Sequence, residues 1–229
     1  MTAAFTAVAH RGDPYVHREN TLPSIRSALR AGAGAVEIDV RLTRDGVPVL
    51  LHDATLKRLW GHERALAALP AAEVRERTGG GVPTLREALA EIAAAPDGGR
   101  LFVDLPDPSA AAAAVAEVRD AGAGERVYYC GAAASMLAVR RADPDAEIAL
   151  TWTTVVPAGA ALLAAVRPRW LNYRFGLVTP ELVARDHAAG LRVSAWTADT
   201  RWTMRRLLRA GVDSITTNRV GALVGLLPR

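Results

Sequence analysis

Hydrophobic runs of strand length alternate with amphipathic segments of helix length from one end of the chain to the other. Short continuous apolar runs predict buried strands, and apolar residues three and four positions apart predict helices that bury one face. The predicted strands are Phe5–Ala9, Ala35–Val40, Leu101–Leu105, Val127–Cys130, Glu147–Thr151, Trp170–Tyr173, Arg192–Trp196 and Ser214–Thr216. The predicted helices are Leu22–Ala31, Leu85–Ala95, Ser109–Ala121, Ala133–Arg141, Gly159–Val166, Pro180–Ala189, Thr200–Ala210 and a short one in Val220–Leu227.

This alternation predicts an α/β protein, because repeated strand–helix units form a parallel sheet with helices packed on it. Eight such strands favour a single (β/α)8 TIM barrel. The alternative is an open doubly wound sheet, but its glycine-rich dinucleotide fingerprint is absent after the first strand. Helix punctuation agrees with these boundaries, since Thr84 and Glu87 form a capping box and Gly190 and Gly211 each follow a predicted helix.

A β-hairpin is predicted within residues 34–53, where two apolar runs flank Asp45-Gly46. Asp-Gly between apolar runs favours a two-residue type I′ turn. Counting outward from that turn, Asp39 faces His52 in a non-hydrogen-bonded pair, where Cα atoms lie roughly 4.5 Å apart. Glu37 lies on the same face because side chains alternate along a strand. The hairpin therefore brings two carboxylates and a histidine together, a set that suits a hard divalent cation beside an acid/base group.

Residues 54–83 are less regular and predict a helical excursion between the hairpin and the next strand–helix unit. They contain Gly79-Gly80-Gly81. A phosphate-binding loop would need a following Lys-Ser/Thr, which is absent, so we interpret the glycines as a linker.

Length and composition fit one barrel, since α/β barrels reach 229 residues as a single domain, here expected to span residues 1–229. Half of the residues are hydrophobic. The single cysteine, Cys130, cannot form an internal disulfide and ends an apolar run, so we expect a buried thiol and a cytoplasmic location.

The net charge of +4 comes almost entirely from scattered arginines, and Lys57 is the only lysine. Aromatic residues do not interleave with the basic ones, so no nucleic-acid partner is expected. The N-terminus lacks a basic region, and no run approaches the roughly 18 apolar residues of a membrane span, so no stable membrane insertion is expected. Nothing indicates the oligomeric state.

Barrels of this kind carry their reactive groups at the C-terminal ends of the strands, with a shared mouth. Six chemically active residues lie at or just after the C-terminal ends of the predicted strands or return through the hairpin: His10, Arg11, Glu37, Asp39, His52 and Asp104. Each residue alone would be unremarkable, and their shared placement predicts a site.

The motifs around these residues give the chain a family resemblance. They are Ala9-His10-Arg11-Gly12, Glu19-Asn20-Thr21, Glu37-Ile38-Asp39-Val40, Thr43-Arg44-Asp45-Gly46, His52-Asp53, Trp196-Thr197 and Gly211-Val212-Asp213-Ser214-Ile215-Thr216-Thr217. In order and spacing over nearly the whole chain, the sequence resembles the glycerophosphodiester phosphodiesterase family. The resemblance implies a TIM barrel that hydrolyses glycerophosphodiesters to glycerol 3-phosphate and an alcohol, using a divalent cation, commonly Ca²⁺ or Mg²⁺.

The resemblance also implies roles for individual residues. Glu37 and Asp39 match metal-binding carboxylates, His10 and His52 match an acid/base pair, and Arg11 matches a phosphate-contacting arginine. Which histidine is the acid and which is the base stays open. Phosphodiester chemistry agrees, because displacement builds negative charge that a cation and Arg11 would stabilise.

Three positions depart from the family pattern. Asp104 stands where a glutamate is usual, so its carboxylate, offered as a third metal ligand, sits on a shorter stem. Pro106 replaces a lysine and removes a positive charge, which Arg174 could supply from another strand. Asn218 stands where an aspartate is common.

The sequence as a whole predicts a metal-dependent phosphodiesterase with a small-molecule phosphodiester substrate. A lysophospholipid or another phosphodiester is the first alternative. The second is a non-catalytic barrel that binds phosphate-containing ligands, which Pro106 favours and the two histidines oppose. Trp196 either forms a wall of the substrate pocket or packs at the mouth, and Asn20 is expected to organise the loop after His10.

Overall fold

The parallel strands of this chain close into a barrel, as the sequence predicts. The computed structural model describes residues 5–95 and 98–228. In this part of the chain the barrel strands are β1 (Thr6–His10), β2 (Ala35–Leu42), β4 (Arg100–Asp104), β5 (Val127–Gly131), β6 (Ile148–Trp152), β7 (Trp170–Arg174), β8 (Arg192–Trp196) and β9 (Ser214–Thr217). Each pairs in parallel with its neighbour, and β1 pairs with both β2 and β9, which closes the ring. The predicted (β/α)8 TIM barrel is confirmed.

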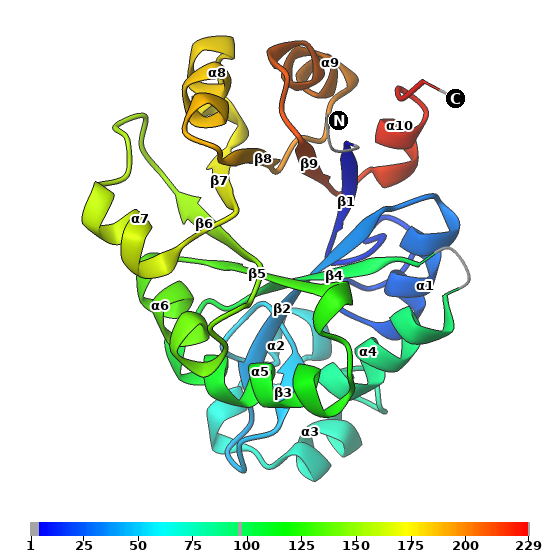
Figure 1. Cartoon of the computed structure of the whole chain (residues 1–229). Helices are drawn as coiled ribbons and strands as arrows, with labels where there is room; N and C mark the ends of the chain where they lie inside the picture. The colour runs from blue at the N-terminus through cyan, green and yellow to red at the C-terminus, as the bar shows by residue number, and fades with distance from the viewer. Residues whose placement is uncertain (1–4, 96–97, 229) are drawn as a thin grey trace.

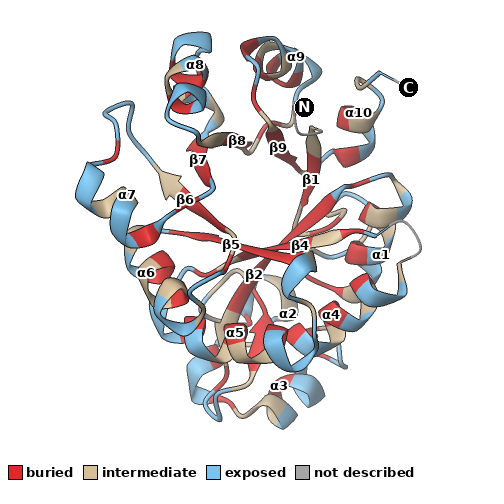
Figure 2. Cartoon of the chain, viewed as in Figure 1, coloured by how far each residue is buried: buried red, intermediate tan, exposed pale blue. Residues whose placement is uncertain are grey.

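The helices lie outside this ring (Figure 1). They are α1 (Leu22–Arg30), α4 (Leu85–Ala94), α5 (Ala111–Asp120), α6 (Ala133–Ala142), α7 (Ala160–Val166), α8 (Pro180–Ala188), α9 (Arg201–Ala210) and α10 (Val220–Val224). Figure 2 shows buried residues along the strands and on the helix sides that face them, so the main core lies between strands and helices. The predicted capping box at Thr84 and Glu87 is present at the start of α4.

The hairpin forms, but the predicted two-residue turn is wrong. β3 (Pro48–Leu50) pairs antiparallel with β2, and its partners are Leu42↔Pro48, Arg41↔Val49 and Val40↔Leu50. The amide of Thr43 donates to the Val47 carbonyl at 3.1 Å, so Arg44, Asp45 and Gly46 form a three-residue loop. Gly46 has φ of +79°, the left-handed conformation that such a loop requires.

The extra loop residue shifts the register by one. The amide of Leu51 bonds to the Asp39 carbonyl at 3.0 Å, so Asp39 faces Leu51 in a hydrogen-bonded pair. Asp39 and His52 are therefore not a cross-strand pair. His52 follows the end of β3, and its carbonyl accepts a hydrogen bond from Arg41 Nε at 2.8 Å.

Residues 54–83 form the expected helical excursion. It contains α2 (Lys57–Trp60), a 3-10 turn, η1 (Leu66–Ala68), and α3 (Ala71–Arg77). Its buried side chains Leu56, Leu66, Leu69, Val74 and Val82 pack with Val49 and Leu51 of the hairpin arm in a separate small core. The amide of Gly80 returns to the Arg75 carbonyl at 2.8 Å, so the glycine run ends α3.

Aromatic side chains fill the N-terminal end of the barrel. Phe102 stacks on Tyr128 with ring centroids 4.3 Å apart, and Tyr128 lies 6.1 Å from Trp170. The guanidinium of Arg100 covers Tyr128 and that of Arg192 covers Trp170. This layer closes one end of the barrel, which leaves the C-terminal end for a ligand. No helix in the described ranges has the length and apolar character needed to cross a bilayer.

Candidate active site

A pocket of about 310 Å³ lies inside the C-terminal end of the barrel. The structure brings all six predicted mouth residues and Trp196 together in its lining. The lining residues are His10, Arg11, Glu37, Asp39, His52, Phe102, Asp104, Pro106, Cys130, Gly131, Ala132, Thr151, Asn172, Trp196, Thr197 and Thr216. Arg174 is exposed and is not among them, so it does not replace the positive charge absent at Pro106.

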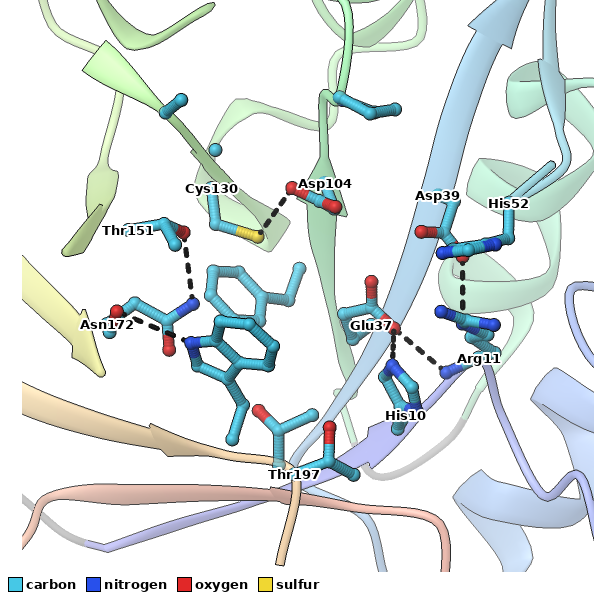
Figure 3. Close-up of a pocket in the computed structure, with 16 residues that line it drawn as sticks. His10, Arg11, Glu37, Asp39, His52, Asp104, Cys130, Thr151, Asn172 and Thr197 are labelled. Atoms are coloured by element: carbon cyan, nitrogen blue, oxygen red, sulfur yellow. Dashed lines mark hydrogen bonds and ion pairs between the residues drawn. The ribbon is translucent and has the colours of Figure 1, made fainter. Parts of the chain in front are cut away.

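Three carboxylates form the acidic side of this pocket (Figure 3). Glu37 and Asp39 point inward from β2, and Asp104 ends the neighbouring strand β4, in register with Asp39. One oxygen of each lies within 4.8 Å of the others, so Asp104 reaches the cluster despite its short stem.

Burial, together with repulsion from Asp39 and Asp104, raises the pKa of Glu37 well above its usual range. Burial, followed by the charge of Asp39, raises the pKa of Asp104 to about 6. A divalent cation would relieve this crowding of negative charge, and oxygen ligands suit a hard ion such as Ca²⁺ or Mg²⁺. The donor set therefore fits the expected cation.

Arg11 and Asn20 hold this acidic side in place. The backbone amide of Arg11 donates to Glu37 Oε2 at 3.0 Å, and its Nε forms an ion pair with Asp39 Oδ2 at 3.1 Å. Asn20 Nδ2 donates to the same Asp39 oxygen at 2.7 Å. Both Arg11 and Asn20 adopt a left-handed φ of 56°. Asn20 is buried, and its backbone amide donates to the Arg11 carbonyl at 3.0 Å, so it also contacts the loop after His10.

His10 is held at the end of β1 by a residue from the far end of the chain. Its Nδ1 lies 2.8 Å from Asn218 Oδ1, 208 positions away. Its Nε2 lies 3.9 Å from Glu37 Oε2, on the pocket side. Burial, and then the charge of Arg11, lowers the pKa of His10.

His52 stands at the rim, with 45% of its side chain exposed against 19% for His10. Its Nδ1 lies 2.6 Å from Asp53 Oδ1. Arg58 Nε donates to Asp53 Oδ2 at 2.6 Å, and this guanidinium lowers the pKa of Asp53 to about 2. Arg58 also bonds to Glu19, which pairs with Arg11 at 2.9 Å. A continuous set of charged contacts thus links His52 to Arg11.

The opposite wall is less charged. Trp196 lines the pocket and its Nε1 donates to the Asn172 carbonyl at 3.4 Å, so it both packs and forms a wall. Cys130 Sγ lies 3.6 Å from Asp104 Oδ1, and burial raises the pKa of this thiol, as expected of a structural cysteine.

Sequence reasoning missed the residues that support the histidines. Asp53 and Glu19 lie inside the motifs that carry the family resemblance, whereas Arg58 and Asp199 lie outside them. For two of them the sequence offers one signal, which is closeness to a predicted site residue. Asp53 follows His52, and Asp199 stands three residues after Trp196.

Comparison with known proteins places the chain in a family. A sequence model described as the glycerophosphoryl diester phosphodiesterase family matches residues 10–222. The chain is 33% identical to "Probable glycerophosphodiester phosphodiesterase 2" of Mycobacterium tuberculosis, over 96% of this chain and 90% of that protein. It is 27% identical to the glycerophosphodiester phosphodiesterase of Caldanaerobacter subterraneus, over 96% of each.

Two solved structures share the fold. The structure of an Oleispira antarctica phosphodiesterase in complex with the product sn-glycerol-3-phosphate has a TM-score of 0.86 and 23% identity, and the match covers 96% of this chain and 95% of that one. The glycerophosphodiester phosphodiesterase of Thermotoga maritima has a TM-score of 0.85 and 22% identity, over 99% and 100%. By the family match and the full-length relatives, this chain belongs to the glycerophosphoryl diester phosphodiesterase family and is an enzyme of that class.

Proposed function

We propose that the protein hydrolyses glycerophosphodiesters to glycerol 3-phosphate and an alcohol, with a divalent cation and with His10 and His52 as the acid/base pair. The observation that carries this proposal is the convergence of three carboxylates, Arg11 and both histidines on one pocket. The complex of the Oleispira antarctica phosphodiesterase with sn-glycerol-3-phosphate supports the same product here.

Glu37, Asp39 and Asp104 would hold the cation, which when bound supplies positive charge for the phosphate oxygens. Arg11 would contribute a second positive charge, because its guanidinium lines the pocket beside Asp39. Its orientation is fixed at both ends, by Asp39 and by Glu19. Held donors of this kind stabilise charge that develops in a transition state without a further cost of reorganisation.

The two histidines have different hydrogen-bond partners, and this difference suggests their roles. His10 bonds through Nδ1 to a neutral amide oxygen, which leaves Nε2 on the pocket side as a proton acceptor. His52 instead bonds through Nδ1 to the carboxylate of Asp53, which places a negative charge beside its ring. We therefore assign His10 as the base that takes a proton from the attacking hydroxyl and His52 as the acid that protonates the leaving oxygen.

The position of His52 agrees with this assignment. It stands at the exposed rim, whereas His10 lies deeper. A leaving alcohol of variable size would depart toward solvent past His52, and the glycerol phosphate part would occupy the inner pocket against Trp196. The size of the head group would then be limited mainly by the rim.

A lysophospholipid is a second candidate substrate, and one observation favours it. The large exposed hydrophobic side chains in the described ranges are Tyr15, Val16, Val155, Val156 and Trp202. All belong to segments that follow the C-terminal ends of β1, β6 and β8, at the end of the barrel where the pocket opens. An acyl chain could contact such a rim. The non-catalytic alternative is opposed by the support that both histidines receive.

Phosphorus NMR of the purified protein tests the proposal. Glycerophosphocholine, glycerophosphoethanolamine and lysophosphatidylcholine are incubated separately with Ca²⁺, Mg²⁺, Mn²⁺ or EDTA. We expect glycerol 3-phosphate from the two glycerophosphodiesters with metal only, and a loss of roughly 10²–10⁴-fold in rate for His52→Ala. His62→Ala is the matched control, because His62 lies outside the pocket and bonds to the Arg77 carbonyl. Metal-independent turnover, or an active His52→Ala variant, would contradict the proposal.

A further inference from the structure

Behind His10 lies a short chain of hydrogen bonds that ends in a carboxylate. Asn218 Oδ1 lies 2.8 Å from His10 Nδ1, and Asn218 Nδ2 donates to Asp199 Oδ2 at 2.7 Å. His10 is the last residue of β1, and Asn218 and Asp199 follow the C-terminal ends of β9 and β8; these three strands are consecutive in the barrel. The contact between them is therefore a consequence of the ring order.

Asp199 is itself fixed by two further donors. Its Oδ1 accepts the backbone amide of Asn218 at 2.8 Å and the hydroxyl of Thr217 at 3.1 Å. Thr217 is fully buried at the end of β9. With Oδ1 held in this way, Oδ2 faces the side-chain amide of Asn218.

This arrangement determines which way the Asn218 amide points. An ionised carboxylate only accepts hydrogen bonds, so the atom that faces Asp199 Oδ2 must be the NH₂ group of Asn218. The atom that faces His10 must then be the amide oxygen, which also only accepts. His10 Nδ1 must therefore carry the proton, and Nε2 is left without one in the neutral ring.

We propose that Asp199 and Asn218 are positioning residues that hold neutral His10 in the tautomer with the proton on Nδ1, so that Nε2 is free to accept a proton from the attacking hydroxyl. The inference rests on the proposed role of His10 as base. In the transfer, the O–H bond of the nucleophile breaks and an Nε2–H bond forms, while the Nδ1–H bond to Asn218 stays intact. Asp199 touches neither the substrate nor the reacting atoms.

Asp199→Asn tests this reasoning because it reverses two side-chain hydrogen bonds. One joins residue 199 to Asn218, and the other joins Asn218 to His10. The oxygen of the new amide keeps the two donors from Thr217 and the backbone, so its NH₂ group faces Asn218. Two NH₂ groups cannot bond to each other, so the Asn218 amide rotates and presents its own NH₂ group to His10. His10 Nδ1 must then accept, and the proton moves to Nε2.

The double exchange Asp199→Asn with Asn218→Asp provides the matched rescue. The carboxylate at position 218 would accept from both His10 Nδ1 and the NH₂ group at position 199. It contains the same side chains in exchanged places and restores the original tautomer. A merely structural role for Asp199 predicts no such recovery.

The experiment measures the ¹⁵N signals of the His10 ring and the steady-state kinetics on glycerophosphocholine with Ca²⁺. The His10 signals are assigned by their loss in His10→Gln. For Asp199→Asn we expect a proton on Nε2 in place of Nδ1, with kcat reduced by roughly 10²–10⁴-fold and KM within about threefold. The double exchange should return the proton to Nδ1 and most of kcat.

Asp120→Asn, an exposed carboxylate on α5, is the control and should match the unmodified protein. Unchanged ¹⁵N signals in Asp199→Asn, or a double exchange that recovers neither the tautomer nor kcat, would overturn the proposal. If Asp199→Asn fails to fold, Asn218→Ala replaces it and should show both tautomers; a signal from Nδ1–H alone would then refute the inference. The ¹⁵N spectra do not require an active enzyme. An inactive protein would therefore disprove the proposed function, and it would not by itself decide the tautomer of His10.

Discussion

Asp104 should make the metal-free protein less stable as the pH rises, because its carboxyl lies in a crowded acidic cluster. Its pKa rises from an ordinary value of 3.8 to about 6 in the fold. A carboxyl with a raised pKa binds its proton more tightly in the folded than in the unfolded state. The free energy of unfolding therefore falls as pH rises from about 4 to about 6, and the loss is complete above about 6.

The magnitude follows from the two pKa values. A rise from 3.8 to about 6 corresponds to about 3 kcal/mol, at about 1.36 kcal/mol per pH unit. Asp104→Asn removes the charge and keeps the shape, so we expect the variant in EDTA at pH 8 to gain about 1–3 kcal/mol. For a chain of this length that gain raises Tm by roughly 3–10 °C. Near pH 4 the two proteins should melt together.

A divalent cation should narrow this difference. Binding stabilises the folded state by about 2.7 kcal/mol when the free ion is at 100 times its Kd. Asp104→Asn would lose one of the three proposed carboxylate ligands and should gain less. Differential scanning calorimetry at pH 4 and 8, with EDTA or with Ca²⁺, measures both effects, and Asp120→Asn is the exposed control. If Asp104→Asn melts below the unmodified protein in EDTA at pH 8, the reasoning about crowded charge is wrong.

Three further substitutions test other parts of the site. Gly12→Ala should lower the free energy of unfolding by more than about 2 kcal/mol, because φ of Gly12 is +87° and the new Cβ would lie 2.6 Å from the Ser24 carbonyl carbon. Urea titration measures this loss, and an unchanged unfolding midpoint would contradict it. Asn20→Ala removes a buried donor from Asp39, so calorimetric titration should show weaker Ca²⁺ binding and urea titration a loss of about 1–3 kcal/mol; equal Ca²⁺ affinity would argue against Asp39 as a ligand. Arg11→Lys cannot pair with both Asp39 and Glu19, so KM for glycerophosphocholine should rise about tenfold or more, and a normal KM would exclude phosphate contact through the guanidinium.

Local sequence determined most of the scaffold. Outside the excursion at residues 54–83, alternating apolar runs and helix caps place each barrel strand and each helix within a few residues of its observed bounds, because these signals depend on neighbours in the chain. The rule that barrel strands present reactive groups at their C-terminal ends then predicts the shared pocket of Glu37, Asp39 and Asp104. That prediction needs only the order of the strands and the direction of their side chains.

The hairpin register shows where local reasoning fails. Asp45-Gly46 marks the tip correctly, but both a two-residue and a three-residue loop accept this pair. The observed loop includes Arg44, whose amide bonds to the Leu69 carbonyl at 2.8 Å, and Asp45 Oδ1 accepts from the Ala71 amide at 2.9 Å. The longer loop therefore contacts the excursion at residues 54–83. These contacts cannot be predicted from the hairpin sequence alone.

The support of the two histidines depends on tertiary structure for the same reason. Asn218 reaches His10 across 208 positions because closure of the ring places β9 beside β1. Arg58 reaches Glu19 because the excursion folds back over the loop after β1. The residue types that carry the chemistry are written in the sequence. Their hydrogen-bond directions depend on side chains that meet only when the barrel closes.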